Sequence, residues 1–137
     1  MKYIKKNICG LLCLLILQSC DKSYEGALRK IVEQEKIPHF DKYNAMVIIP
    51  GSGCTGCITQ AEDYFLQNCH DTSTLFILTY NLSLKEVSLR LKEENINKEN
   101  VIIDKSNKFY LSRYQDAIYP IVCTLDKGHI INIRKLN

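Results

Sequence analysis

The sequence predicts a single α/β domain whose central sheet mixes parallel and antiparallel strands. Apolar, β-branched segments alternate with segments of helical periodicity, which is typical of parallel strands joined by helices. The last part of the chain has two short strand segments separated by a turn, which predicts an antiparallel hairpin. A Cys-x-x-Cys pair, Cys54 and Cys57, follows the first strand segment. With 137 residues the chain has the length of one domain.

The first strand and the first helix of this domain frame the cysteine pair. Residues 45–49 form an apolar run that predicts a buried strand, and residues 58–68 have the spacing of an amphipathic helix. Between them lies a glycine-rich turn that contains both cysteines. Four side chains of this helix are expected to face the core: Ile58, Ala61, Tyr64 and Phe65.

A central strand and a capped helix come next. Residues 74–80 are a continuous apolar and β-branched run, which is typical of a strand buried on both faces. Ser83 and Glu86 have the spacing of a capping box, so a helix is expected to begin there, with Leu82 packed on Val87. The buried stripe of this helix is expected to be Leu84, Val87 and Leu91.

The remaining segments complete the predicted sheet. A short strand at residues 101–103 is followed by a short helix that Ser106 caps and that carries aromatic side chains. Residues 121–125 and 129–133 form the two strands of the hairpin, with an Asp-Lys-Gly turn between them. The aromatic residues of the short helix are expected to lie in the core, with the lining of a groove as the alternative: Phe109, Tyr110 and Tyr114.

Residues 1–19 are not part of this domain. Three lysines precede a short apolar run, the pattern of a secretory signal, and the run is shorter than the roughly 20 residues that span a bilayer. The run ends in Leu17-Gln18-Ser19-Cys20, which resembles the bacterial lipobox. This resemblance implies a lipoprotein signal peptide that is cleaved after Ser19, with acylation of Cys20. A plain signal peptide without a lipid is the alternative.

Cleavage changes how charge and cysteine content are interpreted. Without the three lysines of the leader, the basic residues fall from 18 to 15 and equal the 15 acidic residues. A mature chain without net charge or a Lys/Arg cluster gives no indication of nucleic-acid binding. Cys9 and Cys13 leave with the leader, and an extracytoplasmic location permits disulfides among the cysteines that remain unacylated. These are Cys54, Cys57, Cys69 and Cys123.

Residues 20–44 join the proposed anchor to the predicted domain at residues 45–137. Within this segment, residues 23–36 have helical spacing of apolar side chains, and Ser23 is a candidate N-cap. The segment is therefore either a tether or a helix that packs on the domain.

The position of Cys54 and Cys57 favours redox chemistry. At a helix N-terminus, the Cys54 sulfur would lie near unpaired N–H groups and the positive end of the helix dipole, which stabilise a thiolate and lower its pKa. Cys57, one turn along, is placed to close a disulfide with it. We therefore predict that Cys54 is the nucleophile and Cys57 the resolving thiol, with a static structural disulfide as the alternative.

The order of elements, with Cys-x-x-Cys after the first strand, resembles the thioredoxin fold. A second feature agrees, because Pro120 opens the strand before the hairpin turn, where that family carries a cis-proline. The resemblance implies a thioredoxin-like three-layer α/β/α sandwich with a mixed central sheet, here with the C-terminal helix missing. It also implies a cis Tyr119–Pro120 bond against the disulfide, with Tyr119 and Pro120 holding the substrate chain. The buried acid of many relatives falls at Ile48, counted from Cys54.

The signal, the anchor and the cysteine pair together resemble the membrane-anchored extracytoplasmic reductases of the TlpA type. That resemblance implies a thiol–disulfide oxidoreductase, lipid-anchored to a bacterial membrane and facing the periplasm or the cell surface. Protein thiols or disulfides would be its substrates, and an upstream membrane or periplasmic thiol its electron donor. No cofactor is expected, because the disulfide itself carries two electrons.

The alternative from another functional class is a non-catalytic thioredoxin-fold lipoprotein that binds a partner protein or a metal ion. Zinc needs four ligands, usually two Cys-x-x-Cys pairs, so no zinc site is predicted. A copper site would need a histidine beside the thiolates, and the candidates are His39, His70 and His129. Cys123 is expected to be a buried, inert thiol, and Cys69 either a free thiol or its disulfide partner.

Overall fold

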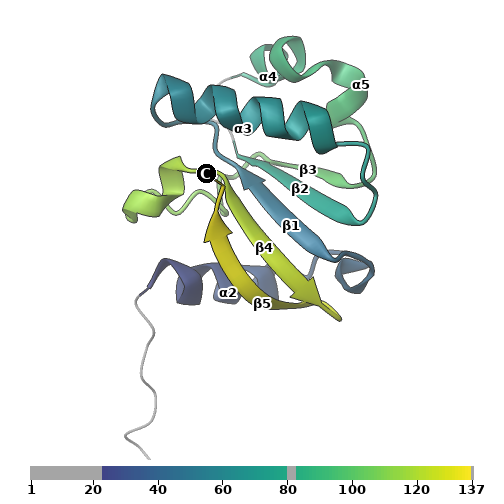
Figure 1. Cartoon of the computed structure of the whole chain (residues 1–137), viewed down its shortest axis with the longest axis vertical. Helices are drawn as coiled ribbons and strands as arrows, with labels where there is room; N and C mark the ends of the chain where they lie inside the picture. Colours follow the sequence, from purple (N-terminus) through teal and green to yellow (C-terminus); the bar gives the residue numbers. More distant parts are fainter. Residues whose placement is uncertain (1–22, 80–82, 137) are drawn as a thin grey trace, which may run out of the picture.

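A five-stranded mixed sheet forms the centre of the molecule (Figure 1). The computed structural model describes residues 23–79 and 83–136. The strand order is β3-β2-β1-β4-β5. The central strand β1 (Ala45–Ile49) is parallel to β2 (Thr74–Thr79) and antiparallel to β4 (Ile121–Asp126).

The two remaining strands are the edges of the sheet. β3 (Val101–Asp104) is parallel to β2, and β5 (His129–Lys135) is antiparallel to β4. The predicted hairpin is therefore confirmed, with its turn at Lys127 and Gly128, both of which have positive φ.

Helices cover both faces of the sheet. On one face lie α3 (Thr55–Asn68), α4 (Leu84–Leu91) and α5 (Glu93–Ile96), and on the other lies α2 (Tyr24–Glu35) (Figure 1). Two separate apolar cores result, one between the sheet and each helical layer. The fold is thus the α/β/α sandwich with a mixed sheet that the sequence predicts, of the thioredoxin-like kind.

The apolar run of β1 is explained by these two cores. Met46 and Ile48 contribute to the core under α2, whereas Val47 and Ile49 contribute to the core under α3. All four side chains are 3% exposed or less, because successive side chains of a strand point to opposite faces and both faces are covered.

Helix α2 is part of the packed unit. The Ser23 side chain caps it by accepting a hydrogen bond of 3.0 Å from the backbone N–H of Gly26. Leu28, which is fully buried, and Val32 anchor the helix on the sheet. For the described part of this segment, from residue 23 onward, the structure therefore shows a helix packed on the domain. The signal peptide and Cys20 lie outside the described residues.

On the other face, the capping box of α4 is confirmed, but its buried stripe is narrower than expected. Ser83 accepts from the backbone N–H of Glu86, and the Glu86 carboxylate accepts from Ser83 in return. Val87 and Leu91 are buried, whereas Leu84 is 41% exposed, so its assignment to the core was wrong. The expected contact of Leu82 lies outside the described residues.

The predicted helix after β3 is wrong. The buried Asp104 carboxylate accepts hydrogen bonds from the backbone N–H of Phe109 (2.7 Å) and from the Ser106 hydroxyl (3.3 Å). Asn107 has the left-handed φ of 52°, which ends helical geometry. Local hydrogen bonds of this kind compete with a helix, so the segment folds as successive turns before the 3₁₀ helix η3 (Gln115–Ile118). The aromatic residues still reach the core under α2, as predicted.

No helix follows β5 in the part of the chain that the structure describes. On the α3 side of the sheet, the hairpin instead presents exposed polar side chains beyond the buried Val122: Thr124, Asn132 and Arg134. Because these side chains are polar, this part of the hairpin can face water without a covering helix. Among residues 23–79 and 83–136, no helix has the length and apolar character needed to cross a membrane.

Candidate redox site

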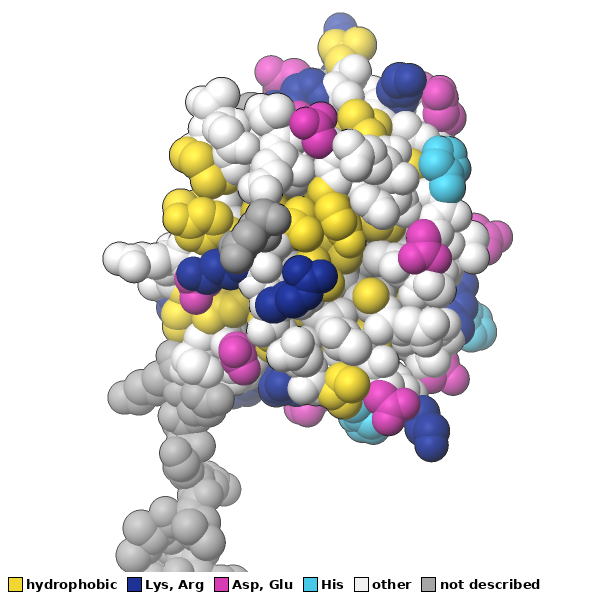
Figure 2. Space-filling view, in the orientation of Figure 1, with side chains coloured by type: hydrophobic (Ala, Val, Ile, Leu, Met, Phe, Trp, Pro, Cys, Tyr) yellow, Lys and Arg dark blue, Asp and Glu magenta, His cyan; other side chains and the backbone are white. Residues whose placement is uncertain are grey.

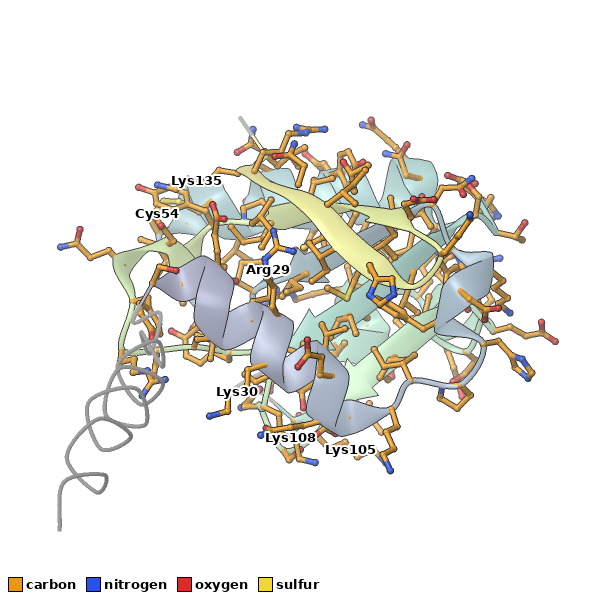
Figure 3. The ribbon with its side chains drawn as sticks, turned by 90° about the horizontal axis from the view of Figure 1, so that it is seen from below. Arg29, Lys30, Cys54, Lys105, Lys108 and Lys135 are labelled. Atoms are coloured by element: carbon orange, nitrogen blue, oxygen red, sulfur yellow. A yellow bond between two sulfur atoms is a disulfide. The ribbon has the colours of Figure 1, made fainter. Side chains whose placement is uncertain are left out.

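The cysteine pair lies where β1 ends and α3 begins. Cys54 is the N-cap of α3, with φ −71° and ψ 149°, and its sulfur accepts a hydrogen bond of 3.1 Å from the backbone N–H of Cys57. The two cysteines form a disulfide, with a Cα–Cα distance of 5.1 Å. Cys54 is exposed and Cys57 is half-buried, so a second thiol can approach Cys54 more easily (Figure 3).

The helix favours negative charge on the exposed sulfur. As N-cap, Cys54 faces the unpaired N–H groups and the positive end of the dipole of a 14-residue helix. The first turn of α3 contains no acidic residue that would offset this effect. After reduction, the Cys54 thiolate is therefore stabilised where an attacking sulfur is needed.

Hydrogen bonds of the buried Thr79 side chain fix the turn that leads to Cys54. The backbone N–H of Gly51 donates to the Thr79 hydroxyl (3.2 Å), which donates to the carbonyl of Ile49 (3.3 Å). Thr79 is 4% exposed, and its bond to the Ile49 carbonyl is buried, whereas the bond from Gly51 is part-buried. The Ser52 hydroxyl is also buried and has no hydrogen-bond partner among the described residues. Pairing between β1 and β2 therefore sets the height of the cysteine turn above the sheet.

Gly53 lets a second loop pack against this turn. Its φ is +156°, and a Cβ atom at this position would lie 2.9 Å from the carbonyl oxygen of Ile118. A side chain would therefore clash with the backbone at the end of η3. The loop before β4 thus packs directly against the residue that precedes Cys54.

The expected cis bond at Tyr119–Pro120 is wrong, because every peptide bond in the described part of the chain is trans. Tyr119 leaves η3 with φ −100° and ψ 149°, the extended conformation that a following proline favours. From there a trans bond leads straight into β4, and trans is the lower-energy isomer. Pro120 is buried, and its carbonyl accepts a hydrogen bond of 2.9 Å from the backbone N–H of Leu136.

The predicted role of Tyr119 and Pro120 in holding substrate therefore loses one of its structural supports. The residue that approaches the cysteine turn closely is Ile118, which precedes Tyr119. The Tyr119 ring is 37% exposed, so it remains accessible to a bound chain. Substrate binding at these two residues stays a prediction.

A charged cluster beside this loop was not foreseen from the sequence. The Lys135 ammonium lies 2.5 Å from the Asp116 carboxylate and 5.0 Å from the centre of the Tyr119 ring. The hydrogen bond to Asp116 raises the pKa of Lys135. The register Ile121↔Lys135 could have indicated this proximity, but register is not readable from either strand alone.

A shallow groove follows α3 from its first turn, where Thr55 and Gly56 separate the two cysteines in the chain. It is lined by Thr55, Thr59 and Tyr64 of the helix, and by Leu136 beyond β5. Figure 2 shows hydrophobic side chains reaching the surface at the centre of this view, below α3. A bound chain could lie in this groove with its sulfur at Cys54.

The position at which many thioredoxin-like proteins carry a buried acid, counted from Cys54, is occupied by Ile48. Ile48 is 3% exposed and pairs with Ile77 of β2 and Ile121 of β4. An apolar side chain here cannot take the proton of Cys57. Proton transfer during exchange must therefore use water or another group.

The other two cysteines are apart from the site and from each other. Cys69 belongs to the core under α3 and Cys123 to the core under α2, so the sheet separates them. Both are free thiols, so the Cys69–Cys123 pairing considered above was wrong. Cys123 is buried as predicted, and burial raises its pKa to about 12.

The histidines lie far from the cysteine pair. His70 follows the C-terminal end of α3, about 20 Å along the helix from Cys54 at 1.5 Å per residue. His129 begins β5 next to the hairpin turn, at the other end of the sheet. His39 precedes the 3₁₀ helix η2 (Phe40–Lys42), which contacts that turn through Asp41. Within the described residues, no group of three or more His, Cys, Asp or Glu side chains could hold a metal ion.

Comparison with known proteins does not assign the chain to a family. No family model matches the chain, and neither the curated proteins nor the solved structures include a significant match. The fold and the geometry of the Cys54–Cys57 site are therefore the features that bear on function.

Proposed function

We propose that this protein is a thiol–disulfide oxidoreductase that uses the Cys54–Cys57 pair outside the cytoplasmic membrane. One observation supports this most strongly: the exposed Cys54 sulfur caps α3 and is bonded to a half-buried Cys57 one turn along. A purely structural disulfide does not require an exposed sulfur at a helix N-terminus, whereas an attacking thiolate is stabilised there.

The reaction exchanges two electrons and two protons between dithiols and disulfides. In the reduced protein, the Cys54 thiolate attacks one sulfur of a substrate disulfide, and the other substrate sulfur leaves as a thiolate. The Cys57 thiolate then attacks the Cys54 sulfur, which closes the protein disulfide and releases the second substrate thiolate. The released thiolates take up protons from water. A dithiol donor, at the membrane or in the periplasm, reduces the protein again by the same steps.

The anchoring part of the proposal is supported by the sequence. The basic leader, its short apolar run and the lipobox-like Leu17-Gln18-Ser19-Cys20 favour acylation of Cys20. A diacylated cysteine would hold the domain on the membrane stably, because two chains are needed for firm attachment. The same features resemble the TlpA-type reductases, and we propose that class for this chain.

Reduction of insulin disulfides, with glutathione or a dithiol as the electron source, tests the proposal. The wild-type protein is expected to accelerate the reaction, and Cys54→Ser should abolish the acceleration. Cys123→Ser is the matched control, because it removes a buried thiol on the other side of the sheet. Insulin reduction that is no faster with the protein than without it would contradict the proposal.

A second function is favoured by Ile48 and by the trans Tyr119–Pro120 bond. Both differ from the thioredoxin pattern, and both would suit a non-catalytic lipoprotein that binds a partner and keeps a static disulfide. Equilibration with glutathione buffers of increasing reducing strength separates the two functions. A structural disulfide should stay closed at potentials near −300 mV, where a redox-active one opens.

A further inference from the structure

The proposed anchor leaves the folded domain very little freedom above the bilayer. Cys20 and the N-cap residue Ser23 are three residues apart, and an extended chain spans at most about 3.6 Å per residue. If Cys20 is acylated, as proposed above, Ser23 lies within about 11 Å of the lipid-bearing residue. The start of α2 is therefore held at the height of the lipid headgroups.

The disulfide lies at this same end of the molecule. Tyr24, the first residue of α2, packs edge-to-face on Tyr114, with ring centres 5.8 Å apart. The chain then passes through η3 to Ile118, which lies so close to Gly53, beside Cys54, that no Cβ atom would fit between them. In Figure 1, α2 starts at the end of the molecule where α3 begins, and Figure 3 shows Cys54 at that end.

The side chains between these two points suit a lipid surface. The Arg113 guanidinium lies 5.0 Å from the centre of the Tyr114 ring, and the Lys135 ammonium lies 5.0 Å from that of Tyr119. Arg113, Tyr119 and Lys135 are exposed. Tyrosine rings with a polar tip and long cationic side chains are the groups that favour the headgroup region. We call Arg113, Tyr114, Tyr119 and Lys135 the tether-end surface.

Acidic groups at this end limit the electrostatic attraction. Asp116 pairs with Lys135, and Glu25 is exposed in the first turn of α2. The exposed Arg134 adds a cation next to Lys135. Among the named groups, three cations face two acids, so electrostatic attraction is weak. The short tether must therefore supply most of the orientation, and the cations and tyrosines the rest.

We propose that the tether-end surface rests on anionic phospholipid headgroups, and that Cys54 therefore exchanges preferentially with disulfides held close to the bilayer. The inference rests on the proposed function, including acylation of Cys20. The expected partners are membrane-bound proteins whose cysteines lie at the height of the lipid headgroups. Freely diffusing proteins are expected to react more slowly. The chemistry is the exchange already described, so no additional oxidant or reductant is needed.

The test uses the full-length acylated protein in vesicles of phosphatidylcholine and phosphatidylglycerol. One disulfide peptide is attached to a lipid headgroup directly, the same peptide is attached through a rigid polyproline spacer, and a third sample is free in solution. The wild-type protein should reduce the headgroup-level peptide about tenfold faster than the peptide on the spacer, because the tether limits its reach. Insertion of about 20 Gly/Ser residues after Asp21 should remove this preference, because such a linker spans about 25 Å on average.

A charge variant tests the surface itself. Arg113→Glu should lower the ratio of the two rates, headgroup-level peptide over spacer peptide, by about fivefold. In vesicles of neutral phosphatidylcholine alone, the variant and the wild type should give the same ratio. Lys127→Glu is the matched control, because it makes the same charge change at the exposed hairpin turn, at the opposite end of the sheet.

The outcomes separate this inference from the proposed function. Equal rates for the two attached peptides, with normal reduction of the free peptide, would overturn the inference and leave the oxidoreductase intact. No reduction of any peptide would overturn both. Protein that does not float with the vesicles would overturn the inference as well, because the anchor is its premise.

Discussion

Gly53 and Gly56 flank the first cysteine, and the structure gives them different roles. Gly53 has a positive φ of 156° and a Cβ atom there would lie 2.9 Å from the Ile118 carbonyl oxygen, whereas a Cβ atom on Gly56 would meet nothing within 4 Å. Gly53→Ala should destabilise the protein by about 1–3 kcal/mol, through backbone strain and the clash. Gly56→Ala should be neutral or stabilise by up to about 1 kcal/mol, because alanine is the better helix former.

Urea denaturation of the oxidised proteins measures this difference. Gly56→Ala is the matched control, because it is the same substitution three residues further along the same turn and helix. Equal unfolding midpoints for the two variants would mean that the η3 loop does not pack against Gly53 as described.

The thiols should differ sharply in reactivity after reduction. Cys54 is exposed at the helix N-cap, whereas Cys123 is buried with its pKa raised to about 12. Brief alkylation near neutral pH should therefore label Cys54 first and Cys123 last, because thiolates react and thiols do not. Mass spectrometry of the digested protein gives the order. Equal labelling of all four cysteines in the native state would refute the assignment.

At the scale of single residues, the sequence predicts the position of the two cysteines correctly, but it does not predict the contacts and the peptide-bond isomer around them. The N-cap position of Cys54 follows from a strand, a glycine-rich turn and a helix that are adjacent in the chain. The trans state of Tyr119–Pro120 depends on how η3 enters β4, and the Lys135–Asp116 pair depends on strand register. Such long-range geometry is not encoded in any local pattern.

Among the elements, the turn between α3 and β2 depends on one carboxylate. Asp71 accepts hydrogen bonds from the Ser73 backbone N–H (3.0 Å), the Ser73 hydroxyl (2.7 Å) and the Thr74 hydroxyl (2.8 Å). These hydrogen bonds hold the pKa of Asp71 below its usual value. The largest effect comes from the Ser73 hydroxyl, followed by the Thr74 hydroxyl and the Ser73 backbone N–H. A lowered pKa in the folded state means that the ionised group stabilises the fold above its unfolded pKa, and that this contribution is lost as the pH falls through the folded pKa.

Asp71→Ala should therefore lower the free energy of unfolding by roughly 1 kcal/mol near neutral pH. The difference from the wild type should shrink at pH values below about 4, where the carboxylate becomes protonated. Urea denaturation across this pH range measures it. Asp63→Ala, which changes an exposed carboxylate on α3, is the control. A difference that grows toward low pH would contradict the assigned sign.

The loop after β3 shows why one predicted element failed. Ser106 has the residue type of an N-cap, and the segment after it carries apolar side chains, so a helix was a reasonable prediction. The Asp104 carboxylate instead binds both Ser106 and the backbone of Phe109, and it can do so because it is buried at the end of a parallel strand. Local propensity was overridden by a contact that depends on the tertiary fold.

At the scale of the whole molecule, strand and helix order determine most of the architecture. Consecutive apolar segments separated by helices favour neighbouring parallel strands with right-handed connections, and the hairpin adds the antiparallel edge. The sheet order β3-β2-β1-β4-β5 agrees with that reasoning. The sequence left open whether residues 23–36 pack on the domain, because the stripe of Leu28, Ile31 and Val32 is short and shows no partner by itself.

The anchor is tested on the intact precursor. Cys20→Ala should abolish incorporation of radioactive palmitate and release the protein from membranes, because the lipid chains provide the attachment. Cys13→Ala is the matched control, since that cysteine lies in the expected leader. Membrane attachment that survives Cys20→Ala would remove both the lipoprotein assignment and the premise of a membrane-facing disulfide.

The central claim is that Cys54 attacks and Cys57 resolves, and trapping of the mixed disulfide tests it most directly. Reduced Cys57→Ser protein, mixed with a disulfide-bonded substrate such as insulin, should accumulate a covalent complex through Cys54, because no resolving thiol can release it. Reduced Cys54→Ser protein should form little or none, since Cys57 is half-buried. Mass spectrometry identifies the linked cysteine. Absence of a complex with Cys57→Ser, or an equal complex through Cys57, would contradict the account.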